Sequence, residues 1–147
     1  MTPANALTAD ASAFVAEGRV ARLGTADARG RPLVVPVCYA FDGRRWYSAI
    51  DGKPKRATGR PLERVRNIEA NPRVSVLIDR YDEDWRRLRY VIIQGQAELL
   101  ADGEEYAYAL GLLTAKYPQY AQVPVGRAGD LVIRVTPESF RQWIWAA

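Results

Sequence analysis

The sequence predicts a mainly β fold, an antiparallel barrel of six to seven short strands with a few helices. Short stretches rich in β-branched and aromatic residues follow one another, and several are joined by hairpin signals such as Asp42-Gly43. These stretches do not alternate with helices, as the strands of a parallel sheet would. The glycine-rich dinucleotide fingerprint and the P-loop are both missing. Because 147 residues are the usual length of one domain, we expect residues 1–147 to form a single unit.

Local signals along the chain define the individual elements. Thr8 or Asp10 can cap a first helix that ends at Gly18, and Pro118 stops the last and longest helix. Asn71-Pro72 closes a middle helix whose apolar residues recur at three-residue spacing. The expected helices cover residues 8–18, 62–70 and 103–117. The expected strands cover residues 20–25, 33–41, 45–50, 74–78, 90–100, 131–135 and 140–145.

The composition excludes several kinds of catalytic site. The sequence contains no histidine, which removes Ser-His-Asp and Cys-His nucleophile systems, histidine zinc sites and histidine-ligated heme. Cys38 is the only cysteine, so a cysteine-rich metal site is also excluded, and we expect no metal and a Cys38 packed as a small apolar side chain. An enzyme of this composition is expected to take its chemistry from an organic cofactor, and we assign no catalytic side chain.

Charge and hydropathy restrict the partners. The net charge is +4, but the arginines are scattered and do not form the stripe that nucleic-acid binding requires. No apolar run approaches the roughly 20 residues of a membrane-spanning helix. The first residues lack a basic segment, and a single cysteine suits a reducing compartment. We therefore expect a cytoplasmic protein with no membrane or nucleic-acid partner.

One basic loop is a candidate phosphate site. A strand leads through Tyr47 and Ser48 into a loop that contains Gly52, Lys53 and Lys55. A hydroxyl, two ammonium groups and accessible backbone N–H groups are the donors that a phosphate requires. Arg64, near the start of the following helix, can add a further donor. Short basic loops are also common as solvated surface, so the spacing alone leaves both interpretations open.

Aromatic residues and arginines beyond this loop have alternative interpretations. Trp85 lies in a charged linker, where a large ring indicates either an interface or a wall over a cofactor. Trp46, Trp143 and Trp145 suit packing in a core or between subunits. The run of arginines that includes Arg89 either forms a solvated face or attracts the polyanionic tail of a cofactor.

Two adjacent segments resemble a known family. "NIEANPRVSVLI" (67–78) followed by "VIIQGQAELL" (91–100) is similar to the signature of the pyridoxamine 5'-phosphate oxidase-like split β-barrels. The similarity covers about residues 20–100, and the tail over 130–145 is similar in pattern only. The resemblance implies an antiparallel split β-barrel of the FMN-binding type. Lys53-Pro54-Lys55 and Asp82-Glu83-Asp84-Trp85 look most like the deazaflavin branch, whose members use coenzyme F420.

The resemblance also implies a site and a partner. The strand over 33–37 would lie along the cofactor ring and offer its backbone groups, while Arg89 or Tyr90 would lie near the flavin. A neighbouring subunit would complete the site, so a homodimer is implied. Extra residues over 56–61 leave open whether Lys55 or Arg64 faces the phosphate. The implied cofactor-binding residues are Val35, Pro36, Val37, Tyr47, Ser48, Lys53, Lys55, Arg64, Trp85 and Arg89.

These observations predict an oxidoreductase that transfers a hydride between coenzyme F420 and a small organic acceptor. Such a transfer requires the ring and the acceptor to be held together in a dry pocket, and no histidine is needed. Two alternatives are an FMN-dependent oxidase or reductase of the same fold, and a non-catalytic protein that carries the flavin or deazaflavin.

Overall fold

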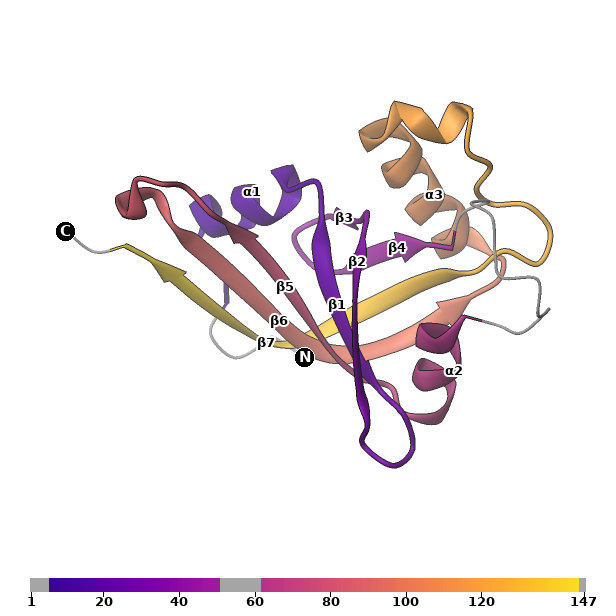
Figure 1. Cartoon of the computed structure of the whole chain (residues 1–147). Coiled ribbons are helices and arrows are strands. Elements are labelled where there is room, and N and C mark those ends of the chain that lie inside the picture. The colour runs from indigo at the N-terminus through magenta and orange to yellow at the C-terminus, as the bar shows by residue number, and fades with distance from the viewer. Residues whose placement is uncertain (1–5, 51–61, 146–147) are drawn as a thin grey trace.

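A computed structural model describes residues 6–50 and 62–145 (Figure 1). Within these residues, seven strands form one antiparallel sheet in the order β2-β1-β5-β6-β7-β4-β3. The predicted mainly β barrel is therefore confirmed. The strands are β1 (Ala21–Ala26), β2 (Pro32–Val37), β3 (Ala40–Phe41), β4 (Trp46–Ala49), β5 (Arg73–Arg80), β6 (Arg89–Leu100) and β7 (Val132–Ile144).

The sheet curls because two strands that are consecutive in the chain lie at its opposite edges. β2 and β3 are the first and last strands of the sheet, yet only Cys38 and Tyr39 separate them. Three steps along the backbone join Val37 to Ala40 and span at most about 11 Å, so the two edges of the sheet must approach each other. The seven strands consequently form an incompletely closed barrel (Figure 1).

The barrel interior holds the larger of the two hydrophobic cores that the described residues form. Alternate residues of β5 and β6 point inward, among them Val76, Ile78, Val91 and Ile93, all essentially inaccessible to solvent. Trp46 of β4 lies among them with no exposed surface. The strand alternation therefore separates a buried inner face of the sheet from an outer face that carries Ser75, Gln94 and their neighbours.

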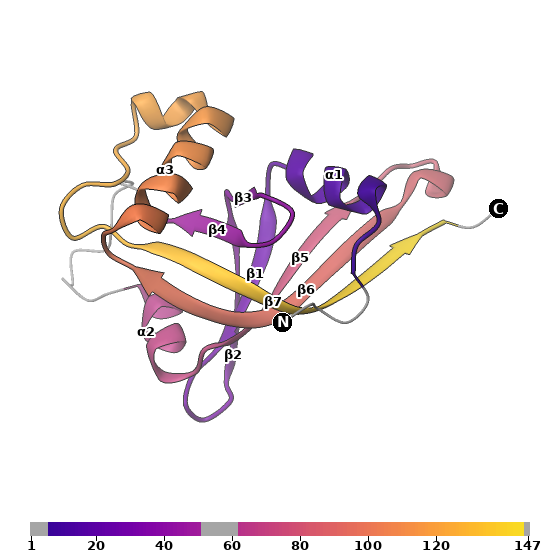
Figure 2. The same ribbon diagram turned by 180° about the vertical axis from the view of Figure 1, so that it is seen from behind.

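Three α-helices surround the sheet. They are α1 (Ala9–Glu17), α2 (Glu63–Ala70) and α3 (Glu104–Lys116), and two 3₁₀ turns, η1 (Trp85–Arg87) and η2 (Pro118–Ala121), complete the described structure. Figures 1 and 2 show α1 and α3 on the side of the sheet that carries β3 and β4, with α2 near the β1–β2 hairpin. The second core lies between α3 and β4, where Tyr47 and Leu113 are buried. All three predicted helices are confirmed within two residues at each end.

Two predicted strand boundaries were wrong. The expected strand over 33–41 is two strands, because the backbone at Cys38 and Tyr39 bonds to side chains. The hydroxyl of Ser48 donates to the Cys38 carbonyl (2.8 Å), and the Tyr39 N–H donates to the hydroxyl of Tyr117 (3.1 Å). The expected pair 131–135 and 140–145 is one strand, β7, because a β-bulge opposite Gln94 and Gly95 accommodates the turn-like residues between them.

Candidate functional site

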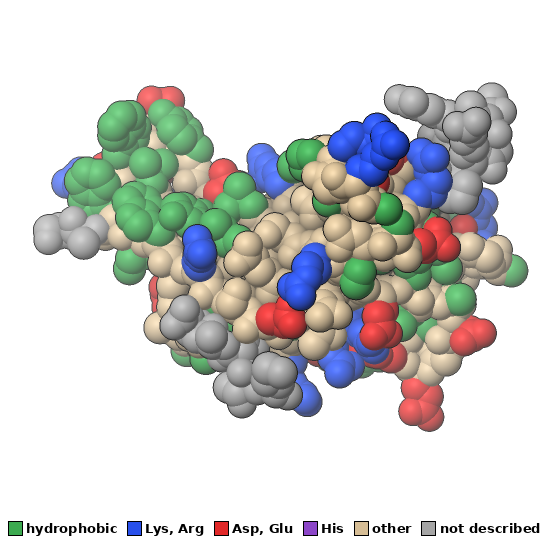
Figure 3. All heavy atoms as spheres, turned by 90° about the horizontal axis from the view of Figure 1, so that it is seen from below, with side chains coloured by type: hydrophobic (Ala, Val, Ile, Leu, Met, Phe, Trp, Pro, Cys, Tyr) green, Lys and Arg blue, Asp and Glu red, His purple; other side chains and the backbone are tan. Residues whose placement is uncertain are grey.

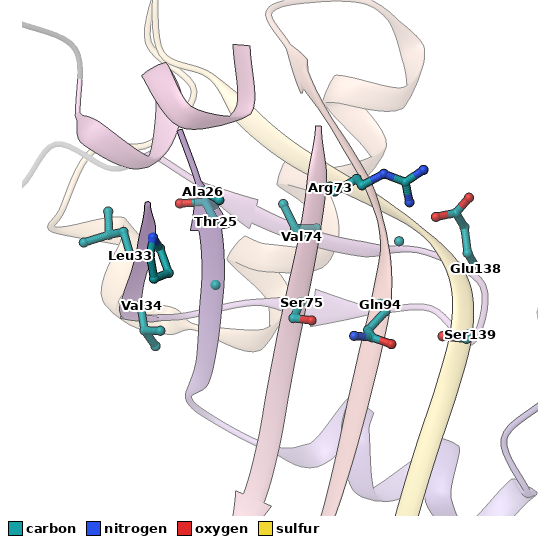
Figure 4. Close-up of a pocket in the computed structure, with 13 residues that line it drawn as sticks. Thr25, Ala26, Leu33, Val34, Arg73, Val74, Ser75, Gln94, Glu138 and Ser139 are labelled. Carbon is teal, nitrogen blue, oxygen red and sulfur yellow. The ribbon is translucent and has the colours of Figure 1, made fainter. Parts of the chain in front are cut away.

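A groove of about 500 Å³ crosses the outer face of the sheet (Figure 4). Five strands contribute to it, from the edge strand β2 to β7. Glycines and short side chains make up most of its surface, with longer polar side chains toward β6 and β7. The lining residues are Gly24, Thr25, Ala26, Pro32, Leu33, Val34, Arg73, Val74, Ser75, Gln94, Gly95, Glu138 and Ser139.

The strand register explains why this part of the sheet is hollow. Val34, Gly24, Ser75, Gln94 and Ser139 are consecutive partners across β2, β1, β5, β6 and β7. Because antiparallel partners point to the same face, these five residues form one row across the outer surface. Glycine and two serines in that row leave the backbone accessible at the floor. A flat ring can therefore approach the sheet closely here.

Strand β2 forms one wall of the groove and is an edge of the sheet. It pairs only with β1 among the described strands, so its backbone groups that point away from β1 have no strand partner. Pro32 and Pro36 remove two N–H donors from this edge, which disfavours pairing with a further strand. The other backbone N–H and C=O groups on this edge could bind a cofactor ring. The family resemblance implies this role for the strand.

A β-bulge places a carboxylate in the groove. Gln94 pairs with Ser139 and Gly95 with Pro137, so Glu138 is the extra residue and points to the outer face. Glycine is required at position 95, because a Cβ atom there would overlap the Thr136 backbone and lie 3.0 Å from the Pro137 Cα. Figure 4 shows the Arg73 guanidinium pointing toward Glu138 from the opposite side of β6.

Helix α2 is attached to the floor of the groove. The Asn67 side-chain amide donates to the hydroxyl of Thr25 (3.0 Å), and both side chains are buried. Thr25 lines the groove, so this bond joins the groove to the helix that follows residues 51–61. Lys53 and Lys55 belong to that segment and lie outside the described residues.

Tyr47 and Ser48 use their hydroxyl groups inside the protein. The Tyr47 hydroxyl donates to Glu105 Oε2 (2.8 Å) beneath α3, and the Ser48 hydroxyl donates to the Cys38 carbonyl. Their exposed fractions are 1% and 2%, respectively. They belong to opposite faces of β4, because Trp46 packs in the barrel core and Tyr47 packs under α3. Neither residue lines the groove on the outer face.

Glu105 is the centre of a charged cluster next to Tyr47. It accepts hydrogen bonds from Tyr47 and from the guanidinium groups of Arg45 and Arg134, and Arg134 also pairs with Glu98 (2.6 Å). Burial would raise the pKa of Glu105, but these hydrogen bonds outweigh it and lower the pKa. Burial, reinforced by the bond to Glu105, raises the pKa of Tyr47. This cluster fixes α3 on the barrel.

The remaining predicted site residues lie at three separate places. Pro36 is exposed on β2, whereas the side chains of Val35 and Val37 pack against the barrel core, so this strand offers mainly backbone. Arg64 is half-buried on α2 and has an interaction partner.

Trp85 and Arg89 lie at the far end of the β5–β6 hairpin. Trp85 is 59% exposed, and Arg89 pairs with Asp10 (3.0 Å) and lies over the Phe14 ring (4.3 Å). Those predicted site residues that the structure describes are thus not brought together within one chain.

Sequence reasoning missed Arg73, Gln94 and Glu138. Arg73 and Gln94 fall inside the two segments that carried the family resemblance, and their alternation with buried residues places them on the outer face. No alternation pattern in the sequence indicates that Glu138 faces outward, because its orientation depends on the bulge. Pro137 next to Glu138 is the one sequence feature that indicates an irregular strand there.

Comparison with known proteins identifies the family. Residues 7–144 match the family model described as pyridoxamine 5'-phosphate oxidase, and the chain therefore belongs to this family. The predicted split β-barrel of this superfamily is confirmed. A comparison with curated proteins found no match.

Solved structures with different cofactors share the fold. The heme storage protein HutZ from Vibrio cholerae matches with a TM-score of 0.72 and 17% identity over 92% of each chain. An FAD-binding protein from Mesorhizobium loti matches with a TM-score of 0.71 and 23% identity over 92% of each chain. An F420 reductase matches with a TM-score of 0.63 and 24% identity, covering 88% of this chain and 94% of its own. At these identities the matches show the fold alone.

Residues 6–50 and 62–145 contain neither a membrane-spanning helix nor a metal-binding cluster. No helix there is long and apolar enough to cross a bilayer. No group of three or more acidic or cysteine side chains in that part of the chain is arranged to hold a metal ion.

Proposed function

We propose that this protein is an oxidoreductase that transfers a hydride between deazaflavin coenzyme F420 and a small organic acceptor. The observation that carries the proposal is the groove on the outer face of a family split barrel, bounded by the edge strand β2. The cofactor supplies the hydride chemistry. The chain would bind it, orient the acceptor and exclude water, without a histidine or a nucleophile.

The groove fits a flavin-type ring by its chemistry. Its floor of glycine and serine allows close approach, and β2 offers backbone groups at its edge. Val34 is 64% exposed beside it and can contact an apolar ring face. Lys53 and Lys55 are proposed to hold the phosphate, with Arg64 on the adjoining helix as a further donor. We place the enzyme in the cytoplasm, as a homodimer.

FMN is the alternative cofactor, because both molecules carry a ribityl phosphate. The longer, anionic tail of F420 would need more arginines nearby than FMN does, and Arg86 and Arg87 next to Trp85 are candidates by sequence. Arg86 pairs with Asp84 (2.9 Å) and Arg87 with Asp82 (3.1 Å), so both guanidinium groups already have carboxylate partners. An F420 reductase and an FAD-binding protein both share the fold, so the fold is compatible with a deazaflavin or a flavin. Heme is disfavoured because the sequence lacks histidine, the commonest axial ligand.

Titration of the purified protein with coenzyme F420 and separately with FMN, followed by quenching of tryptophan fluorescence, tests the proposal. We expect micromolar binding of F420 and a loss of about tenfold or more in the Lys53→Ala/Lys55→Ala double variant, because two charge-assisted phosphate contacts disappear. The control is Arg29→Ala/Arg44→Ala, which removes two exposed positive charges elsewhere. Tight binding of FMN alone selects the alternative, and binding of neither cofactor rejects both.

Turnover distinguishes the enzyme from a cofactor carrier. Reduced F420 absorbs differently from the oxidised form, so hydride transfer to a panel of small acceptors can be followed by absorbance. We expect oxidation of the bound reduced cofactor by at least one acceptor. Binding without turnover on the whole panel would favour a carrier.

A further inference from the structure

The polar end of the groove carries two opposite charges without a strong partner among the described residues. The Arg73 guanidinium makes no hydrogen bond or ion pair with them, although the Arg73 backbone N–H bonds to Asn71. The Glu138 carboxylate accepts one long bond, from the Gln96 amide at 3.4 Å. Both side chains are exposed and line the groove. The groove therefore presents a cation and an anion that the described fold does not use.

Arg73 and Glu138 face each other across β6. Arg73 belongs to β5 and pairs in register with Gln96, while Glu138 belongs to β7 and bonds to the Gln96 side chain. Figure 4 shows the guanidinium and the carboxylate directed toward one another. No ion pair joins the two groups in the described structure, although both line the groove. A ligand that enters here meets a positive group on one side and a negative group on the other.

Polar groups, rather than apolar area, dominate this part of the sheet. Figure 3 shows hydrophobic side chains gathered at the end of the sheet where β7 ends, whereas acidic and basic side chains lie next to one another over the rest of the visible face. Glu138 and Ser139 lie in the middle of β7, away from that apolar end. Gln94 and Ser139 line the groove as well and add neutral hydrogen-bonding groups. A ligand at this place would therefore be recognised by its polar groups.

The two facing charges select a ligand that carries both signs of charge. A lone carboxylate bound at Arg73 would lie next to Glu138 and be repelled by it, and a lone cation at Glu138 would be repelled by Arg73. A zwitterion gains both attractions. Its carboxylate can accept two parallel hydrogen bonds from the guanidinium, while its protonated nitrogen donates to the Glu138 carboxylate.

We propose that the polar end of the groove binds a small zwitterion, with its carboxylate on Arg73 and its protonated nitrogen on Glu138. The rest of the ligand would extend over Ser75 toward Gly24, because these residues follow Gln94 in the same row across the sheet. That row leads to the place proposed for the cofactor ring. The hydride acceptor is therefore a molecule of this class, and this assignment alone rests on the proposed function.

Three ligands that share one ring and differ in their charged groups test the site without any cofactor. L-phenylalanine carries both charges, its methyl ester carries only the ammonium group, and 3-phenylpropanoate carries only the carboxylate. Binding is measured by nuclear magnetic resonance titration of isotope-labelled protein, followed at the side-chain amides of Gln94 and Gln96, which lie beside the two charges. We expect L-phenylalanine to bind about tenfold or more tightly than either analogue, because each analogue loses a charge-assisted contact.

Two variants assign the two charges separately. Arg73→Gln should weaken the binding of L-phenylalanine and 3-phenylpropanoate about tenfold, because both use the guanidinium, and should not weaken the methyl ester. Glu138→Gln should weaken L-phenylalanine and the methyl ester by a similar factor and should not weaken 3-phenylpropanoate. The amide of glutamine keeps the approximate size of the glutamate side chain and removes its charge.

Arg44→Gln is the matched control, since Arg44 is exposed in the β3–β4 turn and does not line this groove. It should bind all three ligands as the wild type does, and circular dichroism checks that every variant is folded. Equal binding of the three ligands, no binding, or variants that weaken all three alike would mean that the two charges are solvated surface, and would overturn the proposal.

Titration of the wild type with F420 separates this inference from the proposed function. F420 binding without selectivity for L-phenylalanine over its analogues rejects the zwitterion site and leaves the proposed function intact. Selective binding of L-phenylalanine by a protein that does not bind F420 supports the site and rejects the proposed function.

Discussion

The ammonium group of Lys116 lies 4.0 Å from the centre of the Tyr39 ring. It is shielded from solvent and makes no hydrogen bond with the described residues. The Tyr117 ring also faces it at 5.4 Å, and Arg19 lies over the same Tyr117 ring. The contact joins the end of α3 to the segment between β2 and β3, so a charged group supports the point where the barrel edges meet.

Lys116→Met should stabilise the protein at neutral pH. Burial, with repulsion from Arg19, lowers the pKa of Lys116 to about 8, against 10.5 for an exposed lysine. The unfolded chain therefore holds this proton more tightly, and the full cost of burying the charge applies below pH 8. The expected gain is about 1 kcal/mol, because the attraction of the Tyr39 and Tyr117 rings offsets part of that cost.

Urea unfolding of both proteins at pH 6.5 and pH 10 measures this effect. The advantage of Lys116→Met over the wild type should shrink as the pH rises from about 8 to 10, because the folded wild type loses the Lys116 proton before the unfolded chain does. Buried tyrosines with raised pKa values, such as Tyr39, lower the stability of both proteins over this range, so the comparison between the two isolates the lysine. Lys116→Arg is the control, since it stays charged throughout. A Lys116→Met advantage that is the same at pH 6.5 and pH 10 would contradict the assignment.

Gly95→Ala should destabilise the protein by about 2–4 kcal/mol. The added methyl group would overlap the Thr136 backbone, and backbone in the bulge cannot move aside as a side chain can. Gly111→Ala is the control. Gly111 lies in α3 with open space around it, so alanine should add about 0.5–1 kcal/mol through helix propensity. Thermal unfolding of both variants gives the comparison, and an equal response would show that the bulge tolerates a side chain.

Tyr47→Phe should cost about 1 kcal/mol of stability, the net contribution of one buried hydrogen bond. It removes the bond to Glu105 and leaves the Arg45 and Arg134 bonds in place. Tyr108→Phe is the comparison, because its bond to Asp42 is solvent-exposed and should contribute much less. Chemical unfolding at pH 7 measures both. A larger loss for Tyr108→Phe would show that the buried cluster is not what holds α3.

The strands and helices could be predicted largely from local signals, because alternation and caps act over a few residues. Thr8 and Gly18 were expected at the ends of the first helix, and they are its caps. The break at Cys38 could not be predicted in this way, since it depends on Ser48 and Tyr117, which are distant in sequence. The residues of the groove were harder to predict, because they also come from segments that are distant in sequence. A groove built from five strands follows from register, and short sequence motifs do not contain register.

Asn67 and Thr25 should be energetically coupled through their hydrogen bond. A double-mutant cycle measures this coupling. Asn67→Ala leaves the Thr25 hydroxyl buried without its partner, and Thr25→Val leaves the Asn67 amide unsatisfied. Each single variant should lose about 1–3 kcal/mol, and the double variant should lose less than the sum, by about 1 kcal/mol. Urea unfolding of the four proteins gives the coupling.

The cycle also connects stability with the proposed site. Because α2 follows the segment that contains Lys53 and Lys55, loosening the helix from the groove floor should weaken F420 binding in Asn67→Ala. Val65→Ala serves as the control, since it removes packing from the same helix and leaves the bond to Thr25 intact. Equal affinities in these two variants would mean that the position of α2 does not depend on this bond. Additive losses in the cycle would mean that the bond itself contributes nothing to stability.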